Sequence, residues 1–299
     1  MKRAVSISIG SSTRDKTVDI RLLGQQVRVE RIGTDGDMEA AAGLFRDLDG
    51  KVDAFGVGGT DLGLRVGEHM YTLHSVQKLV RDVKVTPYVD GGGLKGTLEM
   101  QLGPFIERRL GKELVAKRAF IASAVDRYGM ARSFSESGYE CVFGDLMFSL
   151  GIPLPVRSLR SIRILAALLI PIVSRLPFEW LYPTGKEQEV RKPKWPKYFR
   201  WASVVAGDAL YIKRRMPDSL PGSVIATNTT TPADVEFFRQ AGVRYLISST
   251  PLLDGRTFGT NMMEAALVAV AGKGRPLTTD ELQDLLTRLK MEPQIRRLN

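Results

Sequence analysis

Short runs of apolar residues alternate with turn residues through the first third of the chain. These runs predict four strands, at residues 4–9, 17–23, 27–32 and 52–57. Residues 38–48 carry apolar positions at helical spacing behind Asp37, a residue type that favours the start of a helix. Residues 74–83 predict another helix. We therefore expect a smaller N-terminal α/β domain over residues 1–84.

From residue 85 onward, strand and helix patterns alternate strictly. The expected strands lie at residues 85–89, 119–125, 140–143, 203–206, 224–226 and 245–247. The expected helices lie at residues 97–110, 128–136, 210–215 and 232–240. Three strands, a long crossover at 146–200 and three more strands form the pattern of a doubly wound, Rossmann-like sheet. We expect this sheet to occupy residues 85–258 of an α/β protein, with C-terminal helices in 259–299.

The crossover contains an apolar run, ILAALLIPI, at residues 164–172. A membrane-spanning helix requires about 20 apolar residues, whereas this run is shorter and contains Pro171. We therefore expect no membrane span, and interpret the run as a helix buried against the sheet or in a dimer contact. Arginines at both ends, including Arg163 and Arg175, leave an interfacial helix as an alternative.

The composition is that of an ordinary globular protein with room for two domains: 299 residues, 43% hydrophobic and 25% charged. Cys141 is the single cysteine, which excludes an internal disulfide and a thiolate metal cluster. The first ten residues contain no long apolar run and no cleavage site, so they predict a strand instead of a signal peptide. A cytoplasmic location is the expectation.

The positive charge is uneven along the chain. Residues 1–110 hold 16 Lys and Arg against 15 Asp and Glu, so nearly all of the net charge of +10 falls in residues 111–299. A basic second half suits an anionic small molecule, such as a phosphate, a carboxylate or a dinucleotide. Nucleic acid is the competing partner, but the chain has no helix-turn-helix, zinc-finger or RNP-type signature, and we do not expect it.

Three glycines between a predicted strand and a predicted helix stand in G-x-G-x-x-G register: Gly91, Gly93 and Gly96. In dinucleotide-binding proteins such glycines allow a tight turn whose backbone N–H groups approach a pyrophosphate. Asp126 stands where a ribose-binding acid would, and Arg127 could accept a 2′-phosphate and favour NADP. The alternative is a plain glycine-rich turn, because Asp90 would repel phosphate and Asp126 lies further along the chain than usual.

Most of the predicted strands end in polar residues. In an open α/β sheet, ligands bind at the carboxyl ends of the strands. Asn228 and Thr229 follow one such strand and could bind a ribose or a nicotinamide carboxamide, although this segment also begins a helix. The loop at 253–261, with Arg256, could offer helix N-terminal amides to an anion. The structural alternative is that these residues only cap helices.

Lys95 lies inside the glycine turn and could contact a phosphate, or transfer a proton if burial lowered its pKa. An exposed lysine is the alternative. His69 and His74 are the only histidines, and two histidines without a third ligand do not predict a metal site. The chain also lacks the Gly-x-Ser-x-Gly and Gly-Lys-Ser/Thr motifs of serine hydrolases and P-loop NTPases.

Residues 180–201 interleave all three tryptophans with lysines and arginines. Aromatic residues alternating with cations can stack bases of single-stranded nucleic acid. They can equally form a lid over an anionic ligand or a contact in a homo-oligomer. The prolines of this segment favour an irregular excursion.

Several stretches together resemble a bacterial family labelled quinate 5-dehydrogenase. They read SISIGSS at 6–12, RIGTDGD at 31–37, DAFGVGGTD at 53–61, VDGGGLK at 89–95, FGDLMF at 143–148 and FGTN at 258–261. Quinate and shikimate dehydrogenases oxidise a ring hydroxyl with NAD or NADP and place a lysine–aspartate pair beside it. The resemblance implies that Lys95 and Asp61 form the corresponding catalytic pair. The cofactor loop and the Asn-x-Thr-x-Pro-x-Lys segment of those enzymes do not occur here in that form.

The sequence thus predicts an NAD(P)-dependent oxidoreductase that acts on a small polyol or hydroxy acid, with quinate as a candidate. Substrate would lie between the N-terminal domain and the doubly wound sheet, where Lys95 and Asp61 would share the proton. The alternative is a non-catalytic two-domain protein that binds an anionic metabolite in the same place. A homo-oligomer is left open.

Overall fold

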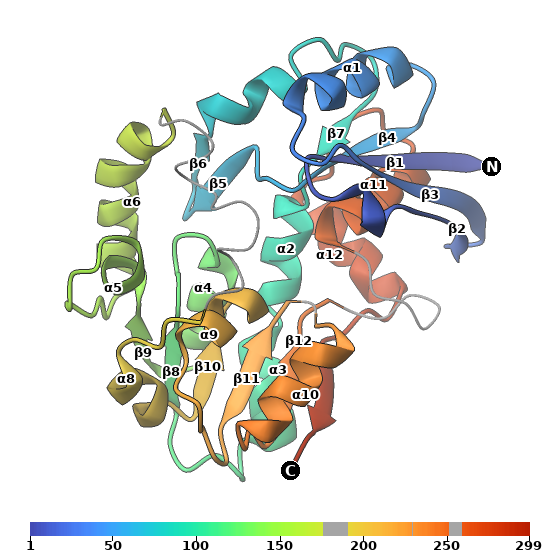
Figure 1. Cartoon of the computed structure of the whole chain (residues 1–299). Helices are drawn as coiled ribbons and strands as arrows, with labels where there is room; N and C mark the ends of the chain where they lie inside the picture. The colour runs from blue at the N-terminus through green and yellow to red at the C-terminus, as the bar shows by residue number, and fades with distance from the viewer. Residues whose placement is uncertain (176–190, 229, 251–258) are drawn as a thin grey trace.

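The computed structural model describes residues 1–175, 191–228, 230–250 and 259–299. Two β-sheets form two halves of the α/β chain, and helix α2 (Gly92–Glu99) lies between them (Figure 1). A small hairpin of β5 (Gly63–Val66) and β6 (His69–Thr72) comes before the last strand of the first sheet along the chain. The two-part α/β architecture expected from the sequence is therefore confirmed.

The first sheet has the strand order β2-β3-β1-β4-β7, and β1, β3, β4 and β7 run parallel. Its strands are β1 (Lys2–Ser8), β2 (Lys16–Leu22), β3 (Gln25–Gly33), β4 (Ala54–Gly58) and β7 (Tyr88–Val89). The helical elements near them are η1 (Ser12–Arg14), α1 (Met38–Leu48) and η2 (His74–Leu79). Strand alternation directs Ala4 and Ala54 to one face of the sheet and Val5 and Phe55 to the other.

The second sheet has the order β13-β12-β11-β10-β8-β9, in which only β13 is antiparallel. Its strands are β8 (Arg118–Ile121), β9 (Glu140–Phe143), β10 (Val204–Ala206), β11 (Val224–Thr227), β12 (Tyr245–Ser248) and β13 (Gln294–Arg297). The helices around it are α3 (Leu102–Leu110), α4 (Tyr128–Glu136), α5 (Asp145–Ser149), α6 (Leu159–Val173), α8 (Pro196–Trp201), α9 (Ala209–Arg215) and α10 (Pro232–Gln240).

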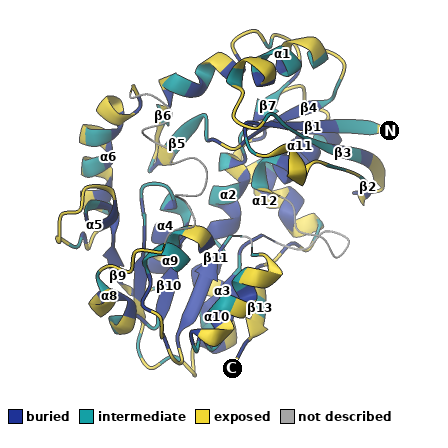
Figure 2. Ribbon diagram, viewed as in Figure 1, coloured by how far each residue is buried: buried dark blue, intermediate teal, exposed yellow. Residues whose placement is uncertain are grey.

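Both faces of the second sheet are covered, as a doubly wound sheet requires. Ile121 and Ala206 belong to a core shared with α3, α4 and α6, whereas Phe120 and Val205 belong to a core shared with α8, α9 and α10. Strands buried on both faces read as continuous apolar runs, which is why the sequence shows them clearly. Figure 2 shows these strands as buried beneath more exposed helices.

Two strands differ from the expectation. The run at 85–89 was expected to open the second sheet, but β7 pairs with β4 of the first sheet, Phe55 opposite Tyr88 and Gly56 opposite Val89. The second sheet gains its sixth strand from β13, which lies beside β12 at the edge. The helix expected at 97–110 is also divided into α2 and α3, and Pro104, which cannot donate a backbone hydrogen bond, lies in the first turn of α3.

The C-terminal helices complete the first half of the molecule. Helices α11 (Thr260–Ala271) and α12 (Thr279–Arg288) pack with α2 in one apolar cluster that includes Ala4 and Val29 of the first sheet. Helix α11 is apolar around most of its circumference because it lies between the sheet and other helices. The first half is thus built from both ends of the chain.

In the described part of the chain, no helix combines the length and the apolar character that crossing a membrane requires. The apolar run at 164–172 forms part of α6, which packs against α4 and β5 at the periphery (Figure 1). Only one side of this helix is buried, through Ile162, Ala166 and Ile170.

Candidate functional site

The glycine turn ahead of α2 is tightly packed. Gly91 has φ +90°, in the left-handed region that favours glycine, and a Cβ there would lie 2.4 Å from the backbone nitrogen of Asn261. A Cβ on Gly93 would lie 2.7 Å from the carboxylate of Glu264, whereas one on Gly96 would meet no neighbouring atom. The first two glycines therefore allow α2 to approach the N-terminal end of α11.

The amides of this turn already have partners within the chain. Leu94 N donates to Glu264 Oε2 at 2.9 Å, and Gly92 N donates to Asp90 Oδ1 at 2.8 Å. Burial raises the pKa of Glu264 to about 7, although its hydrogen bond from Leu94 opposes the rise. Two side-chain carboxylates thus take the place that the sequence prediction gave to a pyrophosphate. In this conformation the turn does not fit a dinucleotide.

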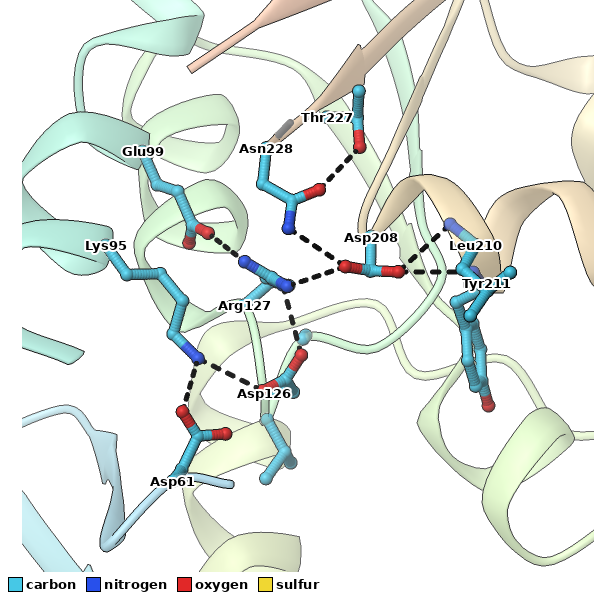
Figure 3. A network of polar contacts seen from close by, with 12 residues as sticks. Asp61, Lys95, Glu99, Asp126, Arg127, Asp208, Leu210, Tyr211, Thr227 and Asn228 are labelled. Carbon is cyan, nitrogen blue, oxygen red and sulfur yellow. Dashed lines mark hydrogen bonds and ion pairs between the residues drawn. The ribbon is translucent and has the colours of Figure 1, made fainter. Parts of the chain in front are cut away.

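Lys95 projects from α2 towards both halves of the molecule. Its Nζ lies 3.3 Å from Asp61 Oδ1, in the segment that follows β4, and 3.3 Å from Asp126 Oδ1, in the segment that follows β8 (Figure 3). The Lys95 side chain is only 14% exposed. The structure therefore brings together Lys95 and Asp61, which the family resemblance had paired, and adds Asp126 as a second partner.

Arg127 contacts three carboxylates, of which Asp126 is shared with Lys95. Its guanidinium lies 2.9 Å from Glu99, 3.1 Å from Asp126 and 3.1 Å from Asp208. The side chains of Arg127 and Glu99 are buried. Because three carboxylates surround Arg127 in this conformation, the guanidinium is not free to accept a 2′-phosphate. Together with Lys95 and Asp61, these residues form what we call the interface network (Figure 3).

The pKa values within the interface network follow from burial and from the two cations. Burial would lower the pKa of Lys95, but Asp126 and Asp61 more than offset this effect and raise it, so Lys95 stays protonated. Burial raises the pKa of Asp61 and of Glu99, and the cations only partly oppose this. Burial would also raise the pKa of Asp126, but Lys95 and Arg127 lower it to about 2. Asp126 is therefore ionised at neutral pH.

The interface network lies at a topological switch point. The chain passes from β8 to β9 on one side and from β10 to β11 and β12 on the other, so the strand order reverses between β8 and β10. Asp126 and Arg127 follow β8, and Asp208 follows β10, both at carboxyl ends of parallel strands. Ligands of open α/β sheets bind at such reversals. The position, as well as the chemistry, identifies a candidate binding site.

Asp208 has two separate roles. Its Oδ1 caps α9 by accepting from the backbone amides of Leu210 and Tyr211, at 3.0 and 3.4 Å. Its Oδ2 accepts from Arg127 and from Asn228 Nδ2, the latter at 2.9 Å. Asn228, a candidate ligand residue from the sequence, therefore contacts the interface network from the end of β11. Its expected companion, Thr229, lies outside the described residues.

Other predicted site residues lie apart from this network or cannot be placed. Asp145, after β9, accepts hydrogen bonds from the amides of Ala124 and Val125 and so supports the segment that carries Asp126. Arg256 and the rest of 251–258 lie outside the described residues, as does the part of the aromatic and basic segment at 180–190. Where residues are described, no cluster of three or more His, Cys, Asp or Glu side chains could hold a metal ion.

Sequence reasoning missed Glu99 and Glu264. Both are acidic residues in otherwise apolar helical stretches, LEM at 98–100 and MMEAAL at 262–267. A charged residue that interrupts an apolar helix face must be paired or satisfied when it is buried, and this was the signal available. Only the fold shows the partners, because Glu264 reaches Leu94 across 170 positions of the chain.

Comparisons with known proteins identify two family models. A model described as a domain of unknown function (DUF8754) matches residues 93–298, and another described as a domain of unknown function (DUF8753) matches residues 3–90. The boundary between them falls at the glycine turn. No curated protein matches the chain.

Several solved structures match the chain at low similarity. Malic enzyme from Entamoeba histolytica is 11% identical with a TM-score of 0.39, covering 97% of this chain and 70% of its own. A galactofuranose binding protein is 12% identical with a TM-score of 0.36, covering 96% and 99%. A periplasmic solute binding protein from Actinobacillus succinogenes 130z with bound D-allose is 10% identical with a TM-score of 0.34, covering 99% and 98%. Likenesses this distant do not bear on function.

Proposed function

The chain belongs to the family described as a domain of unknown function (DUF8754), and we propose that it binds a small polyhydroxylated molecule at the interface network. The observation that carries this proposal is the position of the network. It lies at the strand reversal of the second sheet and is closed from the first half by Lys95 and Asp61. A ligand there would contact both halves of the protein.

The solvent-facing part of the interface network is rich in hydrogen-bond acceptors. The side chain of Asp126 is 37% exposed, and each of its carboxylate oxygens contacts one cation, so each oxygen retains a lone pair for a ligand. An ionised carboxylate only accepts hydrogen bonds, and it accepts two neighbouring hydroxyls well. Ligand hydroxyls would therefore be the donors that this surface lacks.

The charge balance of the network argues against an anion. Four carboxylates, on Asp61, Glu99, Asp126 and Asp208, surround two cations, Lys95 and Arg127. A ligand phosphate or carboxylate would meet uncompensated negative charge, which is unfavourable at such short range. An uncharged polyol, or one with a cationic group, fits better. The alternative prediction from the sequence was a two-domain protein that binds an anionic metabolite. We retain the binding protein of that alternative but propose an uncharged or cationic polyol as its ligand.

Isothermal titration with a matched pair of probes tests the proposal. Myo-inositol and quinate are both polyhydroxylated six-membered carbocycles, but quinate carries a carboxylate. We expect myo-inositol, or an uncharged sugar in the same panel, to bind more tightly than quinate. If no uncharged polyol binds at millimolar concentration, or if quinate binds more tightly than every uncharged probe, the proposal is wrong.

Asp126→Asn is the diagnostic variant. Asparagine keeps an acceptor oxygen within the network and removes the charge that Asp126 would present to the proposed ligand. Loss of a hydrogen bond to a charged group costs about 1.5–3 kcal/mol, so affinity should fall by at least tenfold. Asp218→Asn, an exposed carboxylate paired with Arg191, is the matched control and should bind as the wild type does. Equal affinity in both variants would contradict the assignment.

One observation favours a second candidate function, an oxidoreductase acting on a ring hydroxyl. Lys95 and Asp61 lie 3.3 Å apart, as the resemblance implied, and the raised pKa of Asp61 would let it accept a proton beside a protonated Lys95. The glycine turn does not fit the pyrophosphate of a nicotinamide cofactor. We therefore assign no step of the reaction to such a cofactor. Absorbance of reduced nicotinamide, followed with NAD and NADP on the same polyol panel, would detect this activity.

A further inference from the structure

The outer side of α6 is an apolar stripe that no described residue covers. Ile164, Leu168 and Ile172 follow one another at intervals of four residues, so they lie on one face of the helix. They are 52%, 64% and 66% exposed. The opposite face is buried through Ile162, Ala166 and Ile170. A helix that is apolar on both sides is normally buried all round, so the outer stripe calls for a partner.

The loop that leads into α6 extends the stripe. Leu150, Ile152 and Leu154 are all exposed. With Ile164, Leu168, Ile172 and Val173, they make seven of the twelve exposed large hydrophobic residues in the described part of the chain. Figure 2 shows the outer side of α6 and the loop beside α5 as exposed along one edge of the molecule. Apolar exposure concentrated in this way marks an interaction surface.

The charged residues within this segment are all of one sign. Residues 146–175 contain no aspartate or glutamate and four arginines. Arg157 pairs with Glu140 of β9 at 3.2 Å. Arg160 and Arg163, in the first turns of α6, are exposed and have no ion pair with any described carboxylate. An apolar stripe flanked by free arginines is complementary to a surface that combines acyl chains with negative charge.

We propose that the α6 face, defined as the outer side of α6 with the loop at 150–155, rests on an anionic phospholipid surface. The 15 residues of α6 extend about 22 Å, which suits a helix lying in the plane of the headgroups. A second copy of the chain is the poorer partner, because it would bring the same arginines to a face that offers them no carboxylate. This inference does not depend on the polyol proposal.

Co-sedimentation with lipid vesicles tests the proposal. The full chain would be mixed with vesicles of phosphatidylglycerol and phosphatidylcholine, and separately with phosphatidylcholine alone, at low and high salt. We expect binding to the anionic vesicles, weakened by salt and by the loss of phosphatidylglycerol. Each arginine near a membrane contributes about 1 kcal/mol, so replacing Arg160 and Arg163 by Gln together should weaken partitioning by about 30-fold.

Leu168→Glu separates the α6 face from the rest of the basic surface. Since Leu168 is exposed, the substitution leaves the core intact, and it should weaken partitioning at least tenfold. Val115→Glu, at a fully exposed valine in the loop between α3 and β8, is the matched control and should bind as the wild type does. Circular dichroism would verify that both variants are folded.

Three outcomes would overturn the proposal. The first is a wild type that does not bind anionic vesicles at low salt. The second is binding that Leu168→Glu leaves unchanged, which would assign it to another basic surface. The third is a concentration-dependent dimer in light scattering that Leu168→Glu dissociates while vesicles are not bound, which would assign the α6 face to a second copy.

Discussion

Glu264 should make the stability of the protein fall as the pH rises from about 4.5 to about 7. Its carboxyl is buried between α11 and the first turn of α2, where it accepts from Leu94 N at 2.9 Å. Burial raises its pKa from 4.5 to about 7. Between these two values the unfolded chain has lost the proton, whereas the folded chain still holds it. Folding therefore binds a proton in this window, and stability is lost as the pH rises.

The size of this effect follows from the shift. Each pKa unit corresponds to 1.36 kcal/mol, so a shift from 4.5 to about 7 removes about 3 kcal/mol of stability across the window. Glutamine at this position keeps an oxygen for the Leu94 amide and carries no titrating proton. Glu264→Gln should therefore gain about 3 kcal/mol relative to the wild type between pH 4.5 and pH 8.

Urea unfolding at several pH values measures this difference directly. The quantity of interest is the free energy of unfolding of Glu264→Gln minus that of the wild type, plotted against pH, because other titrating groups cancel in the subtraction. Glu136→Gln, in an exposed pair with Arg132, is the control and should show no comparable trend. A difference for Glu264→Gln that stays constant with pH would refute the buried, amide-bound carboxyl at the start of α2.

Four other substitutions test the packing around the interface network, each by urea unfolding at pH 7. Arg127→Met should lower the free energy of unfolding by about 3–5 kcal/mol, because it leaves the buried Glu99 without its cation. Glu99→Gln should lower it by less, and the opposite order of the two losses would contradict this reasoning. Gly91→Ala should cost at least about 2 kcal/mol, since its Cβ would collide with the backbone of Asn261 at positive φ. Gly96→Ala should instead raise the free energy of unfolding by about 0.5–1 kcal/mol, because residue 96 lies inside α2 with open space around it. A loss of stability in Gly96→Ala would restore the case for a dinucleotide-type glycine turn.

The sequence predicted most of the first half because short apolar runs, turn residues and helical spacing are local signals. The expected helix at 38–48 coincides with α1, and the expected strands at 27–32 and 52–57 lie within one or two residues of β3 and β4. The hydrophobic period of a half-buried element is a local property, so one chain is enough to read it. The doubly wound character of the second half, though not its full set of strands, also followed from its buried apolar strands.

The positions of β7 in the first sheet and of β13 in the second could not be predicted in this way. Strand β7 pairs over two residues only, and its choice of β4 depends on contacts that are distant in sequence. Strand β13 reads QIRR and lies at an edge with mostly exposed side chains, so it has no apolar signal. Pattern reasoning therefore assigned 85–89 to the wrong sheet and gave no strand to the C-terminus.

The sequence predicted which residues form most of the candidate site, but it did not predict their roles there. Lys95, Asp61, Asp126 and Arg127 all appear in the interface network, because polar residues after parallel strands converge on one edge. Their roles depend on charge neighbours, and the sequence did not place Glu99 beside Arg127 or Glu264 beside the glycine turn. A buried carboxyl group opposite a helix N-terminus accepts hydrogen bonds from the same backbone amides that would otherwise bind an anion. A glycine pattern alone does not distinguish the two cases.

Helix α2 connects that internal carboxylate to the interface network. Lys95 and Glu99 are one turn apart and so lie on the same side of the helix, where Lys95 faces Asp61 and Asp126 and Glu99 faces Arg127. Glu264 holds the start of the same helix against α11 through Leu94, next to Lys95 in sequence. The C-terminal helices therefore position the cation that joins the two halves. Substitutions in α11 should therefore change the affinity of a ligand bound at the interface network, although α11 is far along the chain from the residues that contact the ligand.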